Sequence, residues 1–304
     1  MSEKFTIVLT SFNCIKTIEF VIDGICHLAP SPDQVIIIDD ASNDGSIEKI
    51  KSLIFNLPKF ELVLNKENHG QSYSRNLGVE MSKNDFIIFQ DDDDISFVQR
   101  SEEHLKAFAR GADFSYVSSQ KTYPNGYVVF NKNSNFISEP KLSNGIIQHL
   151  VIGKNLPLGV SISAPSCTLA VRKSAFKLLG GFDLELRRLE DIDLVCRALV
   201  SGFTISWSSI ILVNRMHTIG DDKTPSHNHF GELKVIKSNK KFFSRKDYFV
   251  AIKMAKYRSH YFERHYSELL KASFFLPVLF LIAPIKLLSI AKRIRHDLRQ
   301  GNFK

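Results

Sequence analysis

Cysteine is scarce in this chain, and the few cysteines are far apart. The 304 residues include four cysteines, and no two of them form a Cys-x-x-Cys pair: Cys14, Cys26, Cys167 and Cys196. This spacing argues against a zinc knuckle or a disulfide framework and is typical of a protein in a reducing cytosol. The N-terminal residues also lack the apolar core and cleavage site of a signal peptide. We therefore expect a cytoplasmic protein.

The chain also lacks an apolar run of transmembrane length, and its positive charge is unevenly placed. Residues 272–285 are apolar for 14 positions, which falls short of the ~20 that a bilayer-spanning helix needs. Residues 234–304 hold 17 Lys and Arg against 4 Asp and Glu, whereas the rest of the chain holds 23 against 28. The positive charge is therefore a property of the C-terminal tail.

The end of this tail has the pattern of an amphipathic helix. Its apolar face would carry Leu287, Ile290, Ala291, Ile294 and Leu298, and its basic face Lys292, Arg293, Arg295 and Arg299. A basic amphipathic helix beside an apolar segment is typical of attachment to an anionic membrane surface. The alternative is a packing helix or a short coiled coil. We expect peripheral attachment to the inner face of the cell membrane.

The first half of the sequence alternates apolar runs with helical segments. Strands are expected at residues 5–10, 34–38, 60–64 and 86–89, and helices at residues 17–27, 46–54, 71–82 and 98–110. This order predicts βαβ units and an α/β fold with a parallel sheet. After residue 112 the pattern loosens, with short strands expected at residues 113–119, 127–130 and 163–171 and helices at residues 145–152 and 190–201.

Four consecutive aspartates, residues 91–94, follow the fourth expected strand. An acidic run is usually a solvated loop, but that strand has no polar alternation and is expected to be buried on both faces. Adjacent carboxylates raise one another's pKa unless a cation lies among them, and a hard divalent ion would relieve the repulsion. An EF-hand is excluded because position 6 of such a loop is Ser96 rather than glycine.

Polar clusters end three of the expected strands. They are Thr-Ser-Phe-Asn at residues 10–13, Asp-Asp-Ala-Ser-Asn-Asp-Gly-Ser at residues 39–46, and the four aspartates. Because the carboxyl ends of parallel strands share one edge of a sheet, all three clusters can line one crevice. A turn followed by a helix N-cap would explain residues 43–46, but it leaves Asp39 and Asp40 unexplained.

These clusters resemble the motifs of the inverting glycosyltransferases of family 2, which have a GT-A fold. The resemblance continues in N-x-x-N-H-G-Q-S-Y-S-R-N-L-G at residues 65–78 and in G-G-F-D-L-E-L-x-x-L-E-D-I-D-L-V-C-R at residues 180–197. It implies a Rossmann-like, mixed α/β sheet with helices on both faces over residues 1–225. Residues 1–112 would bind the nucleotide sugar, residues 113–225 the acceptor, and residues 226–304 would form a basic helical tail.

Two departures from the family pattern stand out. Ala41 occupies the position where the family usually has glycine in D-D-G-S, and the Q-x-x-R-W pattern of processive members is absent. The second departure favours the addition of one sugar over repeated polymerisation.

The motif match implies roles for the residues that bind the metal. Asp91 and Asp93 would form the D-x-D motif that holds Mn²⁺ or Mg²⁺, with Asp93 the direct ligand. Asp92 would contact the ribose or the donor sugar, and a solvated neighbour is the alternative for Asp94. His217 is a further candidate near the metal or the diphosphate. A divalent ion fits because a nucleotide sugar leaves as a diphosphate whose charge needs a Lewis acid.

The match also implies residues that bind the donor nucleotide. Asp40, or Asp39 beside it, would accept the uracil imide N–H, and Thr10 and Phe12 would flank the base. Phe12 offers a stacking face, although a place in the core is the alternative. Arg75 would contact the donor diphosphate or, alternatively, a structural carboxylate.

The catalytic base should be a carboxylate on the acceptor side of the sugar, since it takes the proton of the attacking hydroxyl. Glu190 and Asp191 begin an expected helix, where acids also stabilise the helix dipole. The motif match favours Asp191 as the base and Glu190 as an acceptor-binding residue. Asp193 is expected to be structural.

The resemblance therefore implies a metal-dependent, non-processive hexosyltransferase that uses a UDP-sugar. By analogy with the family, its saccharide acceptor would be lipid-linked, in the synthesis of a bacterial surface polysaccharide. A nucleotide-sugar-forming nucleotidyltransferase is an alternative, but residues 10–17 lack the glycine of a phosphate loop. A basic nucleic-acid-binding protein would leave the aspartate clusters unexplained, and we expect no nucleic-acid partner.

Overall fold

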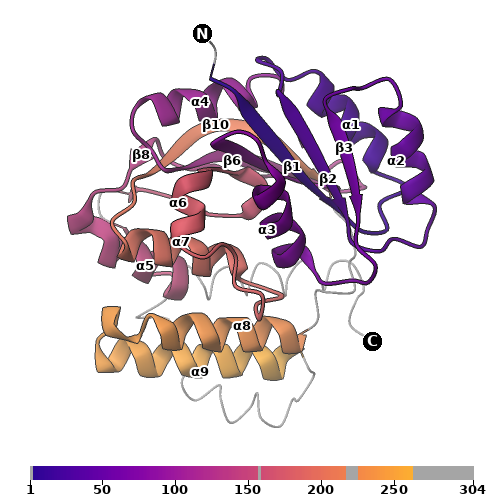
Figure 1. The fold of residues 1–304 in the computed structure, drawn as a ribbon. Helices are drawn as coiled ribbons and strands as arrows, with labels where there is room; N and C mark the ends of the chain where they lie inside the picture. Colours follow the sequence, from indigo (N-terminus) through magenta and orange to yellow (C-terminus); the bar gives the residue numbers. More distant parts are fainter. Residues whose placement is uncertain (1–2, 157–158, 217–224, 263–304) are drawn as a thin grey trace. The chain divides into compact units, whose positions relative to one another are not determined.

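The structure is a computed structural model that describes residues 3–156, 159–216 and 225–262 (Figure 1). The chain divides into two compact units, one of residues 1–140 and 161–221 and the other of residues 141–160 and 222–304. This division differs from the expected one because residues 141–160 group with the C-terminal part of the chain rather than with an acceptor-binding half.

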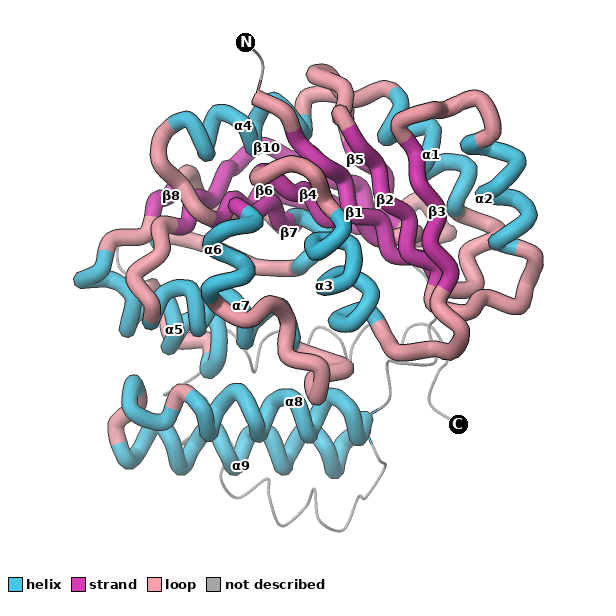
Figure 2. The backbone as a smooth tube through the Cα atoms, viewed as in Figure 1, coloured by secondary structure: helices cyan, strands magenta, loops and turns pink. Residues whose placement is uncertain are grey.

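The first unit is built on one mixed sheet of ten strands, drawn as magenta tubes in Figure 2. Its strands run in the order β3-β2-β1-β4-β9-β6-β10-β5, with β7 paired to β6 and β8 to β10. Strands β1 to β4 are parallel to one another, whereas β9 is antiparallel to both β4 and β6. The strand bounds are β1 (Phe5–Ser11), β2 (Gln34–Asp39), β3 (Phe60–Leu64), β4 (Phe86–Asp91), β5 (Asp94–Ser96), β6 (Phe114–Thr122), β7 (Val128–Asn131), β8 (Phe136–Ile137), β9 (Leu169–Arg172) and β10 (Ile205–Met216).

Helices cover both faces of this sheet, as expected. Residues of α1, α2 and α4 pack with alternate residues of β1, β2 and β4 in one apolar core on the first face. On the other face α3 contacts β1 and β2, and Phe176 of α6 packs on Phe89 of β4. The helices are α1 (Ile18–Cys26), α2 (Ser46–Ile54), α3 (Gln71–Met81), α4 (Arg100–Ala109), α6 (Lys173–Leu178) and α7 (Glu190–Val200). Burial on both faces explains why β1, β2 and β4 have no polar alternation.

Register and close packing place the polar clusters together. Thr10 lies opposite Asp91, and Ser11 lies opposite Asp39, so β1, β2 and β4 end at one edge of the sheet. Helix α3 lies against β1 at Gly78, where an added Cβ would stand only 2.3 Å from a methyl carbon of Val8. Glycine at position 78 therefore sets how closely α3 approaches the sheet.

The second unit contains the helices α5 (Ser143–Ile152), α8 (Pro225–Ser238) and α9 (Arg245–Phe262). Helices α8 and α9 pack side by side (Figure 1). Residues 141–160 join this unit through an ion pair of 2.8 Å between Lys154 Nζ and Asp247 Oδ2. Gln148 adds a hydrogen bond of 2.6 Å from its side-chain amide to the carbonyl of Phe242.

Some expectations fall on parts of the chain that the structure leaves undescribed. His217 and the amphipathic pattern of residues 287–299 lie outside the described residues. Within the described ranges, no helix combines the length and the apolar character that a membrane span requires.

Candidate active site

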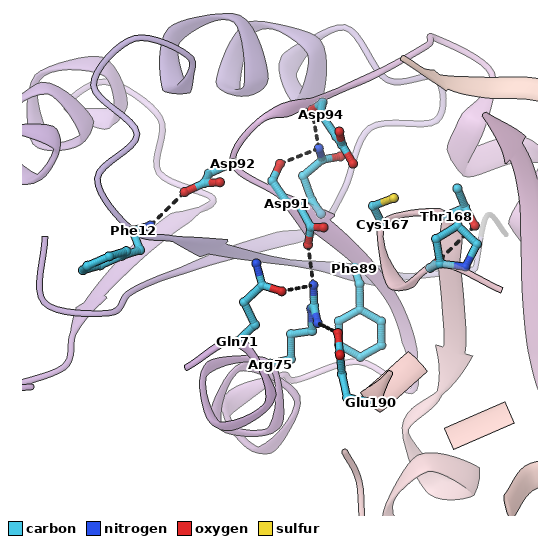
Figure 3. Close-up of polar contacts among 12 residues, drawn as sticks. Phe12, Gln71, Arg75, Phe89, Asp91, Asp92, Asp94, Cys167, Thr168 and Glu190 are labelled. Carbon is cyan, nitrogen blue, oxygen red and sulfur yellow. Dashed lines mark hydrogen bonds and ion pairs between the residues drawn. The ribbon is translucent and has the colours of Figure 1, made fainter. Parts of the chain in front are cut away.

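The four aspartates run from the end of β4 through the turn into β5. The carboxylates of Asp91, Asp92 and Asp94 lie in different surroundings (Figure 3). Candidate ligand atoms of Asp91, Asp94 and Cys167 all lie within 4.8 Å of one another. Asp92 accepts the backbone N–H of Phe12 (2.8 Å). The backbone carbonyl of Asp93 accepts the N–H of Met216 (3.1 Å). The acidic run is therefore a folded turn with defined partners and not a solvated loop.

Asp94 is buried, which excludes the alternative that it is a solvated neighbour. It is 3% exposed because β5 pairs with β10, and Arg215 of β10 approaches its carboxylate to 3.9 Å. Burial, together with the charges of Asp91 and Asp93, raises the pKa of Asp94 to about 7, although Arg215 opposes the shift. Burial likewise raises the pKa of Asp92 well above its usual value, with a smaller contribution from Asp93.

A buried arginine, Arg100, holds the segments on either side of the acidic turn. Arg100 of α4 donates to the carbonyls of Phe89 and Cys167 and to the side chains of Gln90 and Ser96, at 2.7–2.8 Å. Burial lowers its pKa to about 10, so it stays charged at neutral pH. Arg100 thus joins β4, β5 and the 3₁₀ turn Ser166–Thr168 around the aspartates.

The carboxylates at the end of β2 already accept protein donors. Asp39 accepts the Ser42 N–H (2.9 Å) and the hydroxyl groups of Ser42 and Ser11. Asp40 accepts the backbone N–H groups of His69 (3.0 Å) and Gly70 (2.7 Å) and the side chain of Asn65. Both residues are buried, and their contacts bind the loop after β2 to its neighbours. Their contact with uracil stays a prediction.

Phe12 and Thr10 differ in exposure at the end of β1. The Phe12 side chain is 43% exposed, which excludes the alternative that it belongs to the core, whereas Thr10 is buried. The backbone N–H of Phe12 is held by Asp92, so the ring is placed beside the acidic turn (Figure 3).

Ala41, at the position where the resemblance implies glycine, has a left-handed backbone with φ 66°. An L-residue adopts this conformation at a cost of roughly 1–2 kcal/mol, whereas glycine adopts it freely. The left-handed backbone therefore explains why the family pattern has glycine at this position. This chain adopts the same backbone conformation with alanine.

Arg75 of α3 is buried between two carboxylates. Its guanidinium contacts Asp91 Oδ1 (2.7 Å) and Glu190 Oε1 (3.0 Å) and also donates to Gln71 (3.2 Å) (Figure 3). It is 1% exposed and lies over the Phe182 ring, 5.4 Å from the centroid. Of the two roles left open for Arg75, the structure shows the carboxylate contact, and the diphosphate contact stays a prediction.

Helix α7 carries the expected base. Leu189 has a left-handed backbone (φ 65°) and turns the chain into α7, which begins with Glu190 and Asp191. Burial, together with the Glu190 carboxylate, raises the pKa of Asp191 from 3.8 to about 7, although the Ile192 N–H, Arg188 and Arg75 oppose the shift. Asp193 pairs with Arg197 at 2.7 Å, which supports its structural role.

The acidic turn suits a hard divalent cation better than a soft one. Asp91 and Asp94 offer oxygen ligands of the kind that Mg²⁺ and Mn²⁺ prefer. The raised pKa values of Asp92 and Asp94 indicate negative charge that the protein alone leaves poorly compensated. The Cys167 thiol has a pKa raised well above its usual value by burial, so it is a neutral neighbour and not a thiolate ligand.

Comparison with known proteins identifies the family. The family model "Glycosyl transferase family 2" matches residues 6–179. The chain belongs to this family. An uncharacterized glycosyltransferase of Haemophilus influenzae is 24% identical over 194 residues, which are 64% of this chain and 61% of that protein. A cholesterol galactosyltransferase of Borreliella burgdorferi is 30% identical over 91 residues, 30% of this chain and 25% of that protein.

Solved structures share the fold of this family 2 chain. The structure of S. aureus TarS 1-349 in complex with UDP-GlcNAc superposes with a TM-score of 0.60 at 14% identity. The match covers 85% of this chain and 73% of the TarS chain. The complex of the same protein with UDP superposes with a TM-score of 0.59. The expected mixed α/β sheet of the GT-A type is therefore confirmed.

The structure brings most of the expected site residues to one edge of the sheet and adds others. Asp91, Arg75 and Glu190 form one connected network, and Asp92 joins the turn to Phe12. Sequence reasoning did not single out Cys167, Arg100 and Arg215. Arg215 is two residues before the candidate His217 in the sequence, but only the pairing of β10 with β5 shows that it lies near Asp94.

Proposed function

We propose that this protein is a metal-dependent, inverting glycosyltransferase that moves one sugar from a UDP-sugar to a saccharide acceptor. The observation that carries the proposal is a connected pair of sites. Asp191, a carboxyl with a pKa near 7, follows Glu190, and Glu190 shares Arg75 with Asp91 of the acidic turn. A group suited to accept a proton at neutral pH and a group suited to hold a cation thus belong to one network.

In the proposed reaction, the acceptor hydroxyl oxygen attacks the anomeric carbon of the donor sugar. Asp191 takes the hydroxyl proton while the bond from the anomeric carbon to the diphosphate oxygen breaks, and the electron pair leaves with UDP. Attack from the face opposite the leaving group inverts the anomeric configuration. Asp91 and Asp93 would hold a divalent ion, Mn²⁺ or Mg²⁺, at the acidic turn, and this ion would supply positive charge that stabilises the departing diphosphate.

The donor side of the proposal rests on three features. Phe12 presents an exposed ring beside the acidic turn, and uracil stacks on it. Asp40 or Asp39 recognises the base at the end of β2. TarS, whose fold is similar, has been crystallised with UDP and with UDP-GlcNAc, which supports a nucleotide-sugar donor here.

The acceptor side rests on sequence features. The absence of Q-x-x-R-W supports the transfer of a single sugar. The basic, apolar tail supports work at the inner face of the cell membrane. A lipid-linked saccharide of cell-surface polysaccharide synthesis combines both requirements in one acceptor.

Calorimetry of UDP binding with and without Mn²⁺ tests the donor side. We expect Mn²⁺ to strengthen UDP binding and Phe12→Ala to weaken it by about fivefold or more, because stacking of a base on an aromatic ring contributes ~1–3 kcal/mol. Phe20→Ala is the matched control, since Phe20 on α1 is also exposed (58%). The proposal fails if Mn²⁺ leaves UDP binding unchanged, or if both variants behave alike. Mass analysis of products from several UDP-sugars then identifies the sugar.

A further inference from the structure

Helix α3 joins the donor and acceptor sides of the site. The Ser72 hydroxyl donates to the carbonyl of Leu186 (3.1 Å). Asn76 makes two hydrogen bonds of 2.9 Å with the backbone of Phe182, one as donor and one as acceptor. Residues 182–186 lead into α7, so α3 positions the segment that presents Glu190 and Asp191.

Arg75 extends this link to the charged groups themselves. One guanidinium nitrogen contacts Asp91 on the donor side, and the other contacts Glu190 on the acceptor side. All three side chains are largely buried, with 1%, 17% and 11% of their surface exposed. Because an unpaired buried charge is costly, neither carboxylate can leave Arg75 freely. The planar fork of arginine suits two carboxylates at once, which a lysine ammonium does not.

We propose that Arg75 is a positioning residue that couples the cation site to the base-bearing helix: it holds Asp91 and Glu190 together, so the charge of Glu190 affects how strongly Asp91 attracts a cation. This inference rests on the proposed function. Without the Glu190 charge, Asp91 is the remaining anionic partner of Arg75 among the described residues. The Arg75–Asp91 pair then tightens, and Asp91 offers less negative charge to Mn²⁺.

Two acids in the first turn of α7 provide a matched test. Glu190 pairs with Arg75, and Asp193 pairs with Arg197. The other hydrogen bonds of Arg197 go to the backbone carbonyls of Leu179 and Gly181, so Arg197 does not link Asp193 to the acidic turn. We expect Glu190→Gln to weaken Mn²⁺ binding at saturating UDP by about fivefold, the low end of typical coupling between sites. Asp193→Asn should keep Mn²⁺ affinity within about twofold of the wild type.

A second variant tests the route of the coupling. In an Arg75→Lys background, Glu190→Gln should have no further effect on Mn²⁺ affinity, because lysine does not bridge the two carboxylates. Calorimetry gives the affinities, and thermal unfolding confirms that each variant is folded. If Arg75→Lys does not fold, the comparison of Glu190→Gln with Asp193→Asn decides alone.

The outcomes separate this inference from the proposed function. Equal Mn²⁺ affinity in wild type and Glu190→Gln, or an equal loss in Asp193→Asn, overturns the coupling. An undiminished effect of Glu190→Gln in the Arg75→Lys background overturns it too. If the wild type itself binds no Mn²⁺ in the presence of UDP, the proposed function fails, and the coupling fails with it.

Discussion

Asp191→Asn should abolish sugar transfer and stabilise the protein in one step. The substitution keeps the shape of the side chain and removes its charge and its ability to accept a proton. Because a general base typically contributes a factor of about 10²–10⁴, kcat should fall by that amount. UDP binding should stay unchanged, since the proposed donor contacts lie at the ends of β1 and β2 and in the acidic turn, and not on α7. A radiolabelled transfer assay and calorimetry measure the two effects separately.

The stability effect follows from the direction of the pKa shift. The Asp191 carboxyl ionises near pH 3.8 when it is unshifted and near pH 7 in the folded protein. The free energy of unfolding therefore falls as the pH rises from about 4 to 7, because the unfolded chain ionises at Asp191 more easily than the folded protein. Above pH 7 this loss of stability is complete. A shift of three units corresponds to at most about 4 kcal/mol. Water reaches part of this half-buried side chain, so we expect Asp191→Asn to gain about 1–2 kcal/mol at pH 8.

The pH dependence of transfer gives a further readout of the same group. In the wild type, kcat should fall about tenfold per unit below pH 7, since protonated Asp191 accepts no proton. Glu190, Arg188, Arg75 and the hydroxyl of Tyr116 are the ionisable groups that interact with Asp191. Asp193→Asn is the control, with normal transfer and lower stability because it removes the carboxylate partner of Arg197. Normal transfer by Asp191→Asn would refute the assignment of the base.

Two other predictions concern the tail and the loop after β2. Changing the four basic residues Lys292, Arg293, Arg295 and Arg299 to glutamate should abolish co-sedimentation with phosphatidylserine vesicles, since each basic residue contributes about 1 kcal/mol; equal sedimentation of both proteins would contradict the membrane proposal. Ala41→Gly should raise the free energy of unfolding by about 0.5–1 kcal/mol in urea titrations, because glycine relieves the left-handed backbone at φ 66°. A loss of stability would show that the entropy of glycine outweighs that relief.

Local patterns in the sequence predicted the first half of the fold closely. The helices and strands up to α3 begin and end within two residues of the expected positions, because buried strands and amphipathic helices have strong periodic signals. The expected strand at residues 163–171 shortens to Leu169–Arg172, since Pro165 is followed by the 3₁₀ turn Ser166–Thr168. Strand β10 was not expected as a strand. Ser208 and Ser209 interrupt its apolar pattern, and its register with β6 shifts between Trp207 and Val213.

In the candidate site too, the residues within local motifs were predicted, whereas the contacts between distant segments were not. The motifs predicted the acidic turn and the start of α7, whose residues are adjacent in sequence. The burial of Asp94 and its approach to Arg215 depend on the pairing of β5 with β10, and the role of Arg100 depends on carbonyls from β4 and residue 167. The contacts of Arg100 with residue 167 and of Asp94 with Arg215 join segments about 70 to 120 residues apart, which a single sequence does not reveal.

Four like charges in a row are tolerated because each aspartate meets a different environment. Asp91 pairs with Arg75, Asp92 accepts the Phe12 N–H, and Asp94 is buried near Arg215. These partners come from α3, β1 and β10, so folding spreads the charge of the turn over three directions. The compensation is incomplete, since the pKa values of Asp92 and Asp94 stay raised. A structure that needed only a turn here would use fewer acids. Under the proposed function, the excess negative charge would hold the cation that stabilises a departing diphosphate.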